Sequence, residues 1–225
     1  MSRKVRIGSA IFNADQGHLA DAVRELDRAG IDLFHWDVFD GYFVPGLAQS
    51  PRVMRAVRDL TDRPFEVHLC VVDVRRFVPM LSEGQADLVF VPAETSELLY
   101  ECVETVRNCG MSPGVSLSVG TPLSKIEEVL PFVDSVLVLG RFNGETVGKT
   151  HYLPQAVEKV GALSQMLQRK GLQVSIEAAG SLSVETAKQA IAAGADTVVF
   201  GGTLHRAQVG VAERLAELRA ALNNG

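Results

Sequence analysis

Three side chains that could bind a metal ion lie at the ends of two apolar runs. His35 and Asp37 end the run LFHWD, and His68 lies near the end of PFEVHLC. Residues two apart on a β-strand share a face, so His35 and Asp37 are expected to point the same way, with Trp36 facing the helices. Adjacent strands lie about 4.8 Å apart, which would bring His68 beside them. Two imidazoles and a carboxylate suit a divalent cation, and a polar cluster without metal is the alternative.

The remainder of the chain indicates which elements would position these side chains. Eight short apolar runs alternate with segments such as HLADAVRELDRAG, whose apolar residues recur at helical spacing. Such runs are typical of parallel strands that are buried on both faces. They predict a single (β/α)8 TIM-barrel domain over residues 1–225, with a doubly wound open sheet as the alternative. In such a barrel the active site forms at the C-terminal ends of the strands, where the three side chains lie.

Glycine-rich segments follow the last two apolar runs. Gly180 and Ser181 come after the run LQVSIEA, and Gly201, Gly202 and Thr203 come after ADTVVF. Glycines let backbone N–H groups approach an anion closely, and the loops after the seventh and eighth barrel strands often bind phosphate. These five residues therefore predict a phosphate site, and glycines that only make tight turns are the alternative.

The composition argues against some classes of partner. The net charge is −5 and basic residues form no run longer than a pair, so we expect no nucleic-acid binding. No apolar stretch approaches the roughly 20 residues that a membrane span needs. The first residues contain no apolar segment long enough for a signal peptide, and the three cysteines form no metal-type pair. A reduced, cytoplasmic location is expected.

Two motifs make the sequence resemble the ribulose-phosphate 3-epimerase family. HWDVFDGYFVP, at 35–45, corresponds to the family's His-x-Asp-Val-x-Asp-Gly-x-Phe-Val-Pro run, and EVHL, at 66–69, matches as well. The resemblance extends from SAIFNAD at 9–15 to GGTLH at 201–205 and includes GTPL at 120–123. It implies a (β/α)8 barrel of the ribulose-phosphate-binding type, a sugar-phosphate substrate and a homo-oligomer.

The resemblance also implies a mechanism. In the family, a metal ion polarises the ketose carbonyl and stabilises a cis-enediolate, while two aspartates on opposite faces remove and return the C3 proton. His35, Asp37 and His68 stand where the family has two histidines and the first aspartate. Asp37 is therefore the expected catalytic base as well as a metal ligand. Ligand type and resemblance together favour Zn²⁺, with Fe²⁺ or Mn²⁺ as alternatives.

The sequence departs from the family at the second aspartate. The family's Ile-Glu-Val-Asp-Gly-Gly run reads IEAAGS at 176–181, so Ala179 takes the aspartate's place. Ala10 similarly takes the place of an active-site serine. Inversion by two bases needs a proton donor on each face, and alanine cannot donate. Glu177 is a candidate replacement because it shares a strand face with Ala179.

The segment from 140 to 152, GRFNGETVGKTHY, replaces a glycine-rich loop of the family. Lys149 and His151 within it are further candidate donors, and Arg141 is a candidate substrate contact. Asn13, after the first apolar run, is another candidate contact. The stretch GETVGKT resembles a phosphate-binding P-loop, but its glycines are one residue too close together, so no nucleotide site is predicted.

Three functions remain open from the sequence. The first is an isomerase: a ribulose-phosphate 3-epimerase-like enzyme that acts on a phosphorylated ketose with altered proton-transfer groups. The second is a metal-dependent aldolase or lyase, or a one-base isomerase, acting on a sugar phosphate, because a single base suffices for these reactions. The third is a non-catalytic relative that only binds a ligand.

Overall fold

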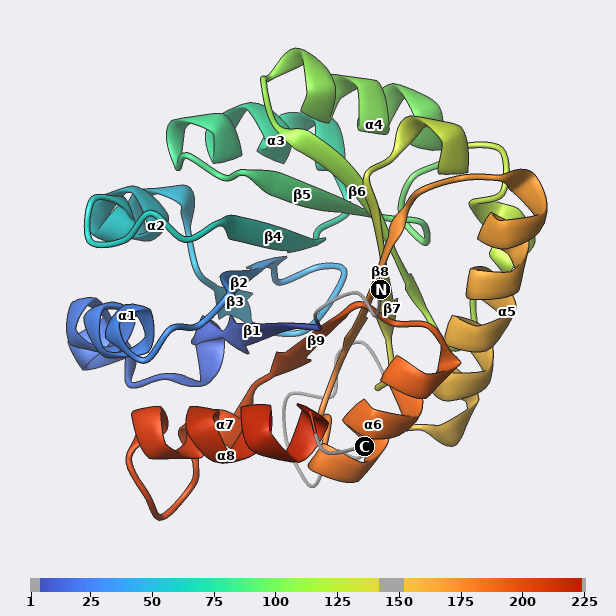
Figure 1. Cartoon of the computed structure of the whole chain (residues 1–225). Helices are drawn as coiled ribbons and strands as arrows, with labels where there is room; N and C mark the ends of the chain where they lie inside the picture. The colour runs from blue at the N-terminus through green and yellow to red at the C-terminus, as the bar shows by residue number, and fades with distance from the viewer. Residues whose placement is uncertain (1–4, 142–151, 224–225) are drawn as a thin grey trace.

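Eight parallel strands close into a barrel in the part of the chain that the computed structural model describes, residues 5–141 and 152–223 (Figure 1). The strands are β1 (Arg6–Ala10), β2 (Leu33–Asp40), β4 (Phe65–Cys70), β5 (Leu88–Pro92), β6 (Ser112–Ser118), β7 (Ser135–Leu139), β8 (Ser175–Ala179) and β9 (Thr197–Phe200). Each strand pairs with the next in this order, and β1 pairs with both β2 and β9, which closes the barrel. The prediction of a (β/α)8 barrel is confirmed.

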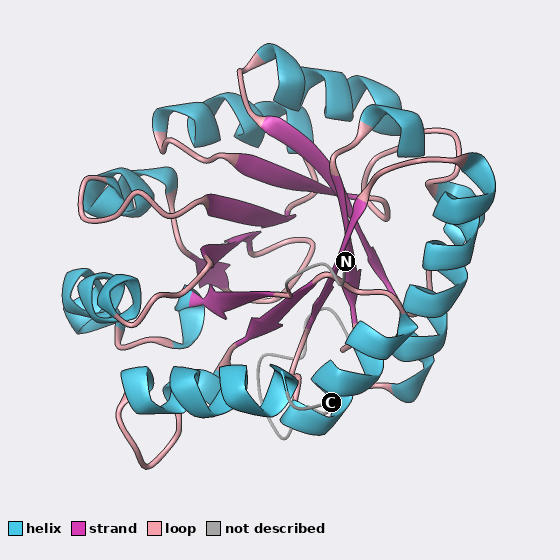
Figure 2. Cartoon of the chain, in the orientation of Figure 1, coloured by secondary structure: helices cyan, strands magenta, loops and turns pink. Residues whose placement is uncertain are grey.

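Helices surround the barrel, as Figure 2 shows in cyan around the magenta strands. They are α1 (Leu19–Arg28), α2 (Pro51–Arg58), α3 (Val74–Glu83), α4 (Leu99–Asn108), α5 (Pro154–Lys170), α6 (Val184–Ala193), α7 (Gly202–His205) and α8 (Val211–Asn223). Between β6 and β7, two short 3-10 turns, Leu123–Lys125 and Leu130–Phe132, take the place of an α-helix. No helix among the described residues is long and apolar enough to span a membrane.

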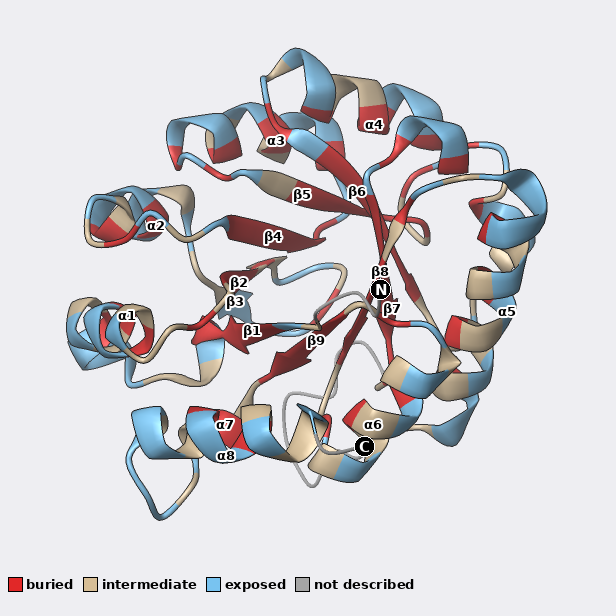
Figure 3. Ribbon diagram, viewed as in Figure 1, coloured by how far each residue is buried: buried red, intermediate tan, exposed pale blue. Residues whose placement is uncertain are grey.

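The main hydrophobic core lies between the strands and the helices, and the strands are buried almost throughout (Figure 3). Phe34 and Trp36 are fully buried in this layer, where their rings lie 5.6 and 5.0 Å from that of Phe65. The alternation of side chains along β2 therefore directs His35 and Asp37 into the barrel. The prediction that Trp36 faces the helix layer is confirmed.

The end of β2 differs from the expectation that this strand stops at Asp37. It continues to Asp40, because its last residues pair antiparallel with the short strand β3 (Leu47–Ala48). The Asp40 carboxylate then fixes the turn, since it accepts hydrogen bonds from the backbone N–H groups of Tyr42 and Phe43. This turn lies beside the open end of the barrel, next to the site described below.

Candidate active site

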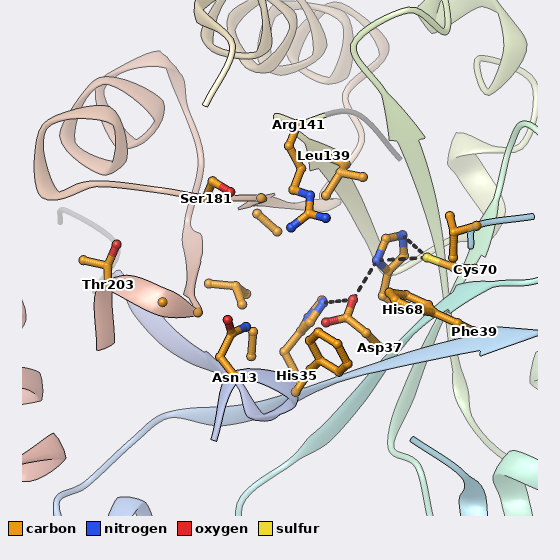
Figure 4. Close-up of a pocket in the computed structure, with 18 of the residues that line it drawn as sticks. Asn13, His35, Asp37, Phe39, His68, Cys70, Leu139, Arg141, Ser181 and Thr203 are labelled. Atoms are coloured by element: carbon orange, nitrogen blue, oxygen red, sulfur yellow. Dashed lines mark hydrogen bonds and ion pairs between the residues drawn. The ribbon is translucent and has the colours of Figure 1, made fainter. Parts of the chain in front are cut away.

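A cavity of about 380 Å³ opens at the C-terminal ends of the barrel strands (Figure 4). Most of the residues predicted for the site line it, namely Asn13, His35, Asp37, His68, Arg141, Gly180, Ser181, Gly201, Gly202 and Thr203. Glu177 does not line the cavity, and Lys149 and His151 lie outside the described residues. The structure thus brings together residues that are far apart in sequence, while their roles stay predictions.

Strand register places the three metal-binding side chains together. Asp37 and His68 are direct partners in the pairing of β2 with β4, so their side chains share the inner face of the barrel. Asp37 Oδ1 lies 3.2 Å from His68 Nδ1 and 3.6 Å from His35 Nε2. One ligand atom from each residue lies within 4.8 Å of the others, a spacing that a single ion could bridge. The three residues therefore fit a divalent metal ion.

Two buried glutamates lie behind His35, deeper in the barrel. Glu66 is the register partner of His35, and its Oε1 lies 2.8 Å from His35 Nδ1. Glu177 Oε1 lies 3.3 Å from the same nitrogen, and both glutamates are at most 4% exposed. The contact with Glu66 leaves His35 Nε2 facing Asp37 and the cavity. Sequence reasoning missed Glu66, although it lies two residues before His68 and so shares the inner face of β4.

Burial and mutual contact shift the pKa values in this cluster. Burial alone lowers the pKa of His35, but hydrogen bonding to Asp37, Glu177 and Glu66 raises this pKa well above its ordinary value. Burial and the nearby charge of Glu177 raise the pKa of Glu66 to about 8. Burial also raises the pKa of Asp37, yet hydrogen bonds with His35 and His68 outweigh it and lower that pKa. Asp37 is therefore ionised at neutral pH, and the carboxyl groups of the cluster favour a positive charge on His35.

Glycine loops form the other end of the cavity. Gly180 has φ +97° and Ser181 has φ +63°, so the chain turns sharply after β8. A side chain at Gly201 would approach Asn13 Nδ2 to 2.6 Å, so glycine there lets Asn13 pack against the loop. The Thr203 hydroxyl donates to the Leu182 carbonyl, which ties the two loops together. Arg206, which sequence reasoning missed, also lines the cavity at this end.

Arg141 extends over the cavity from the end of β7, on the side away from His35 and Asp37 (Figure 4). A Cβ at Gly180 would lie 2.8 Å from Arg141 Cγ, so the absence of a side chain there makes room for the arginine stem. Ala179 is 3% exposed and contributes only a methyl group to the same wall. Among the described residues that line the cavity, Asp37 is the one carboxylate.

Comparison with known proteins identifies several similar chains. Residues 6–205 match the sequence profile of the ribulose-phosphate 3 epimerase family. A ribulose-phosphate 3-epimerase from a Synechocystis strain is 33% identical over 221 residues, which cover 97% of this chain and 95% of that one. A protein of the same name from Methanocaldococcus jannaschii is 34% identical over 200 residues, which cover 89% and 84% of the two chains. A solved 3-hexulose-6-phosphate synthase shares the fold, with a TM-score of 0.72 and 18% identity over 96% of this chain and 99% of that one.

Proposed function

Because this chain belongs to the ribulose-phosphate 3-epimerase family, we propose that it is an epimerase-like isomerase that moves a proton next to the carbonyl group of a phosphorylated ketose. One observation carries this proposal. The ionised Asp37 lies between two histidines at one end of a cavity whose other end consists of glycine loops. A base and an anion site at opposite ends of one cavity suit a small sugar phosphate.

We propose further that a divalent metal ion binds at His35, Asp37 and His68, with Zn²⁺ favoured over Fe²⁺ and Mn²⁺. The hydrogen bond from His35 Nδ1 to Glu66 supports this, because it leaves Nε2 available to a ligand on the cavity side. When bound, the ion supplies positive charge that polarises the substrate carbonyl. The buried glutamates orient His35 and do not reach the cavity.

Asp37 is the proposed base for the proton next to the carbonyl. Its low pKa keeps the carboxylate ionised, and it lines the cavity from β2. No second carboxylate lines the cavity among the described residues, and Glu177 is buried behind His35. The donor for the opposite face is therefore water, or Lys149 or His151 from the segment outside the described residues.

The substrate phosphate is proposed to bind at Gly180, Ser181, Gly201, Gly202 and Thr203. Support comes from the loop geometry, since these residues follow β8 and β9, which are neighbours in the barrel, and line one end of the cavity. Backbone N–H groups in glycine turns can approach phosphate oxygens without a side chain in the way. Asn13, packed against Gly201, is the proposed contact for a sugar hydroxyl.

A one-base isomerase, or a lyase or aldolase, is the second candidate function. The single carboxylate among the described lining residues favours it, because these reactions need a base on one face only. Both candidates use the same proposed metal and phosphate sites. They differ in whether the carbon that loses a proton regains one on the other face.

Proton NMR in D₂O tests the proposal directly. Metal-loaded protein is mixed with ribulose 5-phosphate and then with a panel of phosphorylated ketoses, and H3 is followed. We expect deuterium exchange with inversion, and we expect Asp37→Asn to slow exchange by about 10²–10⁴-fold. Exchange without inversion would support the second candidate. If no compound in the panel exchanged with metal-loaded protein, the proposed function would be wrong.

A further inference from the structure

The cavity wall opposite Asp37 differs in charge from the wall that the family resemblance implies. Ala179, at the end of β8, belongs to the small apolar cluster inside the barrel and offers no polar group. Arg141 lies on the same side and is the charged side chain that this wall contributes among the described lining residues. Where the family has an acidic group, this chain has a methyl group with a guanidinium beside it.

The backbone holds Arg141 in a fixed place. The N–H of Gly140 donates to the Ala179 carbonyl at 2.8 Å, and the Gly140 carbonyl accepts from the Leu153 N–H at 2.7 Å. The arginine stem then packs over Gly180, which has no side chain to displace it. Figure 4 shows the Arg141 side chain extending across the cavity.

Arg141 lines the same cavity as His35, Asp37 and His68. In Figure 4 its guanidinium points toward the side of the cavity where these three residues lie. Its reach is thus not confined to the glycine loops.

The phosphate end has a cation of its own. Arg206 lines the cavity beside Gly202, where an added Cβ would lie 3.6 Å from Arg206 Cδ. Arg141 comes from a different strand end and overhangs the middle of the cavity. The cavity therefore presents two guanidinium groups, one from the chain after β7 and one from the end of α7, whereas a ketose phosphate carries a single anionic group.

We propose that the substrate is a phosphorylated keto sugar acid, whose phosphate binds the glycine loops while its carboxylate pairs with Arg141. This inference rests on the proposed function and names its substrate class. A guanidinium binds a carboxylate through two parallel hydrogen bonds, which gives both affinity and orientation. A cavity of about 380 Å³ is within the range of small-ligand sites.

Calorimetric titration with unreactive ligands tests the proposal without turnover. The probes are inorganic phosphate, arabitol 5-phosphate and arabinonate 5-phosphate. At the end remote from phosphate, the arabitol has a neutral hydroxyl group and the arabinonate has a carboxylate. The wild-type protein should bind the arabinonate at least about tenfold more tightly than the arabitol. Arg141→Met should weaken arabinonate binding about 10–100-fold and change binding of the other two less than about twofold.

Arg206→Met is the matched control, because it removes the same group from the phosphate end. It should weaken binding of all three probes, inorganic phosphate included. Arg141→Lys should lie between wild type and Arg141→Met, since it keeps the charge and loses the paired hydrogen bonds. Thermal unfolding followed by circular dichroism checks that each variant is folded.

Two results would overturn the proposal. One is that Arg141→Met weakens all three probes equally, which would assign Arg141 to the phosphate. The other is that wild-type protein shows no preference for the carboxylate. Either result could coexist with deuterium exchange in ribulose 5-phosphate, so the substrate class can fail while the proposed function stands. If the protein preferred the carboxylate probe but exchanged no proton in any phosphorylated ketose or keto acid, the binding preference would stand and the proposed function would be wrong.

Discussion

His35 is the side chain on which the polar cluster depends. It is 2% exposed, and three carboxyl groups, those of Asp37, Glu66 and Glu177, lie around its ring. A buried imidazole without partners would be unfavourable, so these carboxyl groups decide both its charge and its orientation. Changes at single residues around this ring should therefore alter metal binding before they alter the fold.

Replacing Glu66 tests this dependence. Glu66→Ala removes the acceptor that fixes His35 Nδ1, and we expect Zn²⁺ affinity to fall by about 10–100-fold. Glu66→Gln keeps an acceptor oxygen and should lose less. Competition with a chelator of known affinity measures the effect, and Glu97→Ala, at an exposed glutamate, is the control. Unchanged affinity in Glu66→Ala would mean that Glu66 does not orient His35.

At Ala179, a carboxylate can be added instead of removed. Ala179→Asp adds a carboxylate to the wall that faces Asp37, and we expect the ratio of inversion to exchange at C3 to rise. Ala179→Asn has a similar shape without an ionisable proton donor, so it should leave the ratio unchanged. The NMR experiment in D₂O measures both rates together. An equal ratio in Ala179→Asp and wild type would show that this wall does not limit inversion.

Two elements, β1 and α7, are joined by a partly buried hydrogen bond. Ser9 Oγ lies 2.8 Å from His205 Nε2, and Ser9 is fully buried. This contact ties the short helix after the glycine loop to the barrel. Burial lowers the pKa of His205 to about 4, so the folded protein favours the neutral ring.

The depressed pKa of His205 makes stability depend on pH. The unfolded state binds a proton near the ordinary value of about 6.5, so this contribution is present above that pH and is lost as the pH falls through 4. We expect the free energy of unfolding to fall by up to about 3 kcal/mol more in wild type than in His205→Gln between pH 7 and pH 4. Urea unfolding at several pH values measures this. Parallel curves for the two proteins would contradict it.

Replacing each of two glycines by alanine tests the packing of Tyr152, just before α5, against Gly140, just after β7. A Cβ at Gly140 would lie 2.0 Å from the Tyr152 ring, so Gly140→Ala should lower the free energy of unfolding by about 1–3 kcal/mol. Gly161 lies inside α5, where the nearest atom would be 3.9 Å away. Gly161→Ala should instead raise stability by about 0.5–1 kcal/mol. Urea unfolding of both variants decides, and effects of the same sign would refute the packing argument.

At the scale of the whole molecule, we propose that the chain forms homo-oligomers, as the family resemblance implies. Two large apolar side chains support this, since Tyr42, on the turn after β2, is 88% exposed and Leu47, in β3, is 83% exposed. Exposed apolar groups that lie close together often mark interfaces. Light scattering after gel filtration should show a smaller mass for Leu47→Glu than for wild type. Val53→Glu, at a less exposed site on α2, is the control, and equal masses for all three would exclude this contact.

The sequence predicts much of the whole fold because its signals are local. Alternation along β2 is enough to place His35 and Asp37 inside the barrel and Trp36 outside. The extension of β2 to Asp40 could not be predicted, because it depends on pairing with a two-residue strand that has no periodicity of its own. The role of Glu66 depends on register, which places it against His35 rather than against another residue of β2.

The direction of Arg141 depends on a contact that sequence patterns do not report. Its stem lies over Gly180, which follows a different strand 39 positions later in the chain. The sequence predicts that Gly180 belongs to a phosphate site, and its second effect, making room for the arginine, is visible only in three dimensions. Residues of this kind are the ones for which a structure adds most to a motif.

The two backbone hydrogen bonds of Gly140 have a consequence for how this protein could change in evolution. Gly140 is hydrogen-bonded to Ala179 through its N–H group and to Leu153 through its carbonyl. The chain therefore leaves and re-enters the barrel wall at neighbouring points. Lengthening a chain segment between two fixed points is inexpensive, about 0.6 kcal/mol for each doubling. Insertions and deletions between these points could therefore accumulate while Arg141 keeps its place. The two backbone hydrogen bonds of Gly140 therefore allow this edge of the barrel to change substrate preference in evolution while the fold stays the same.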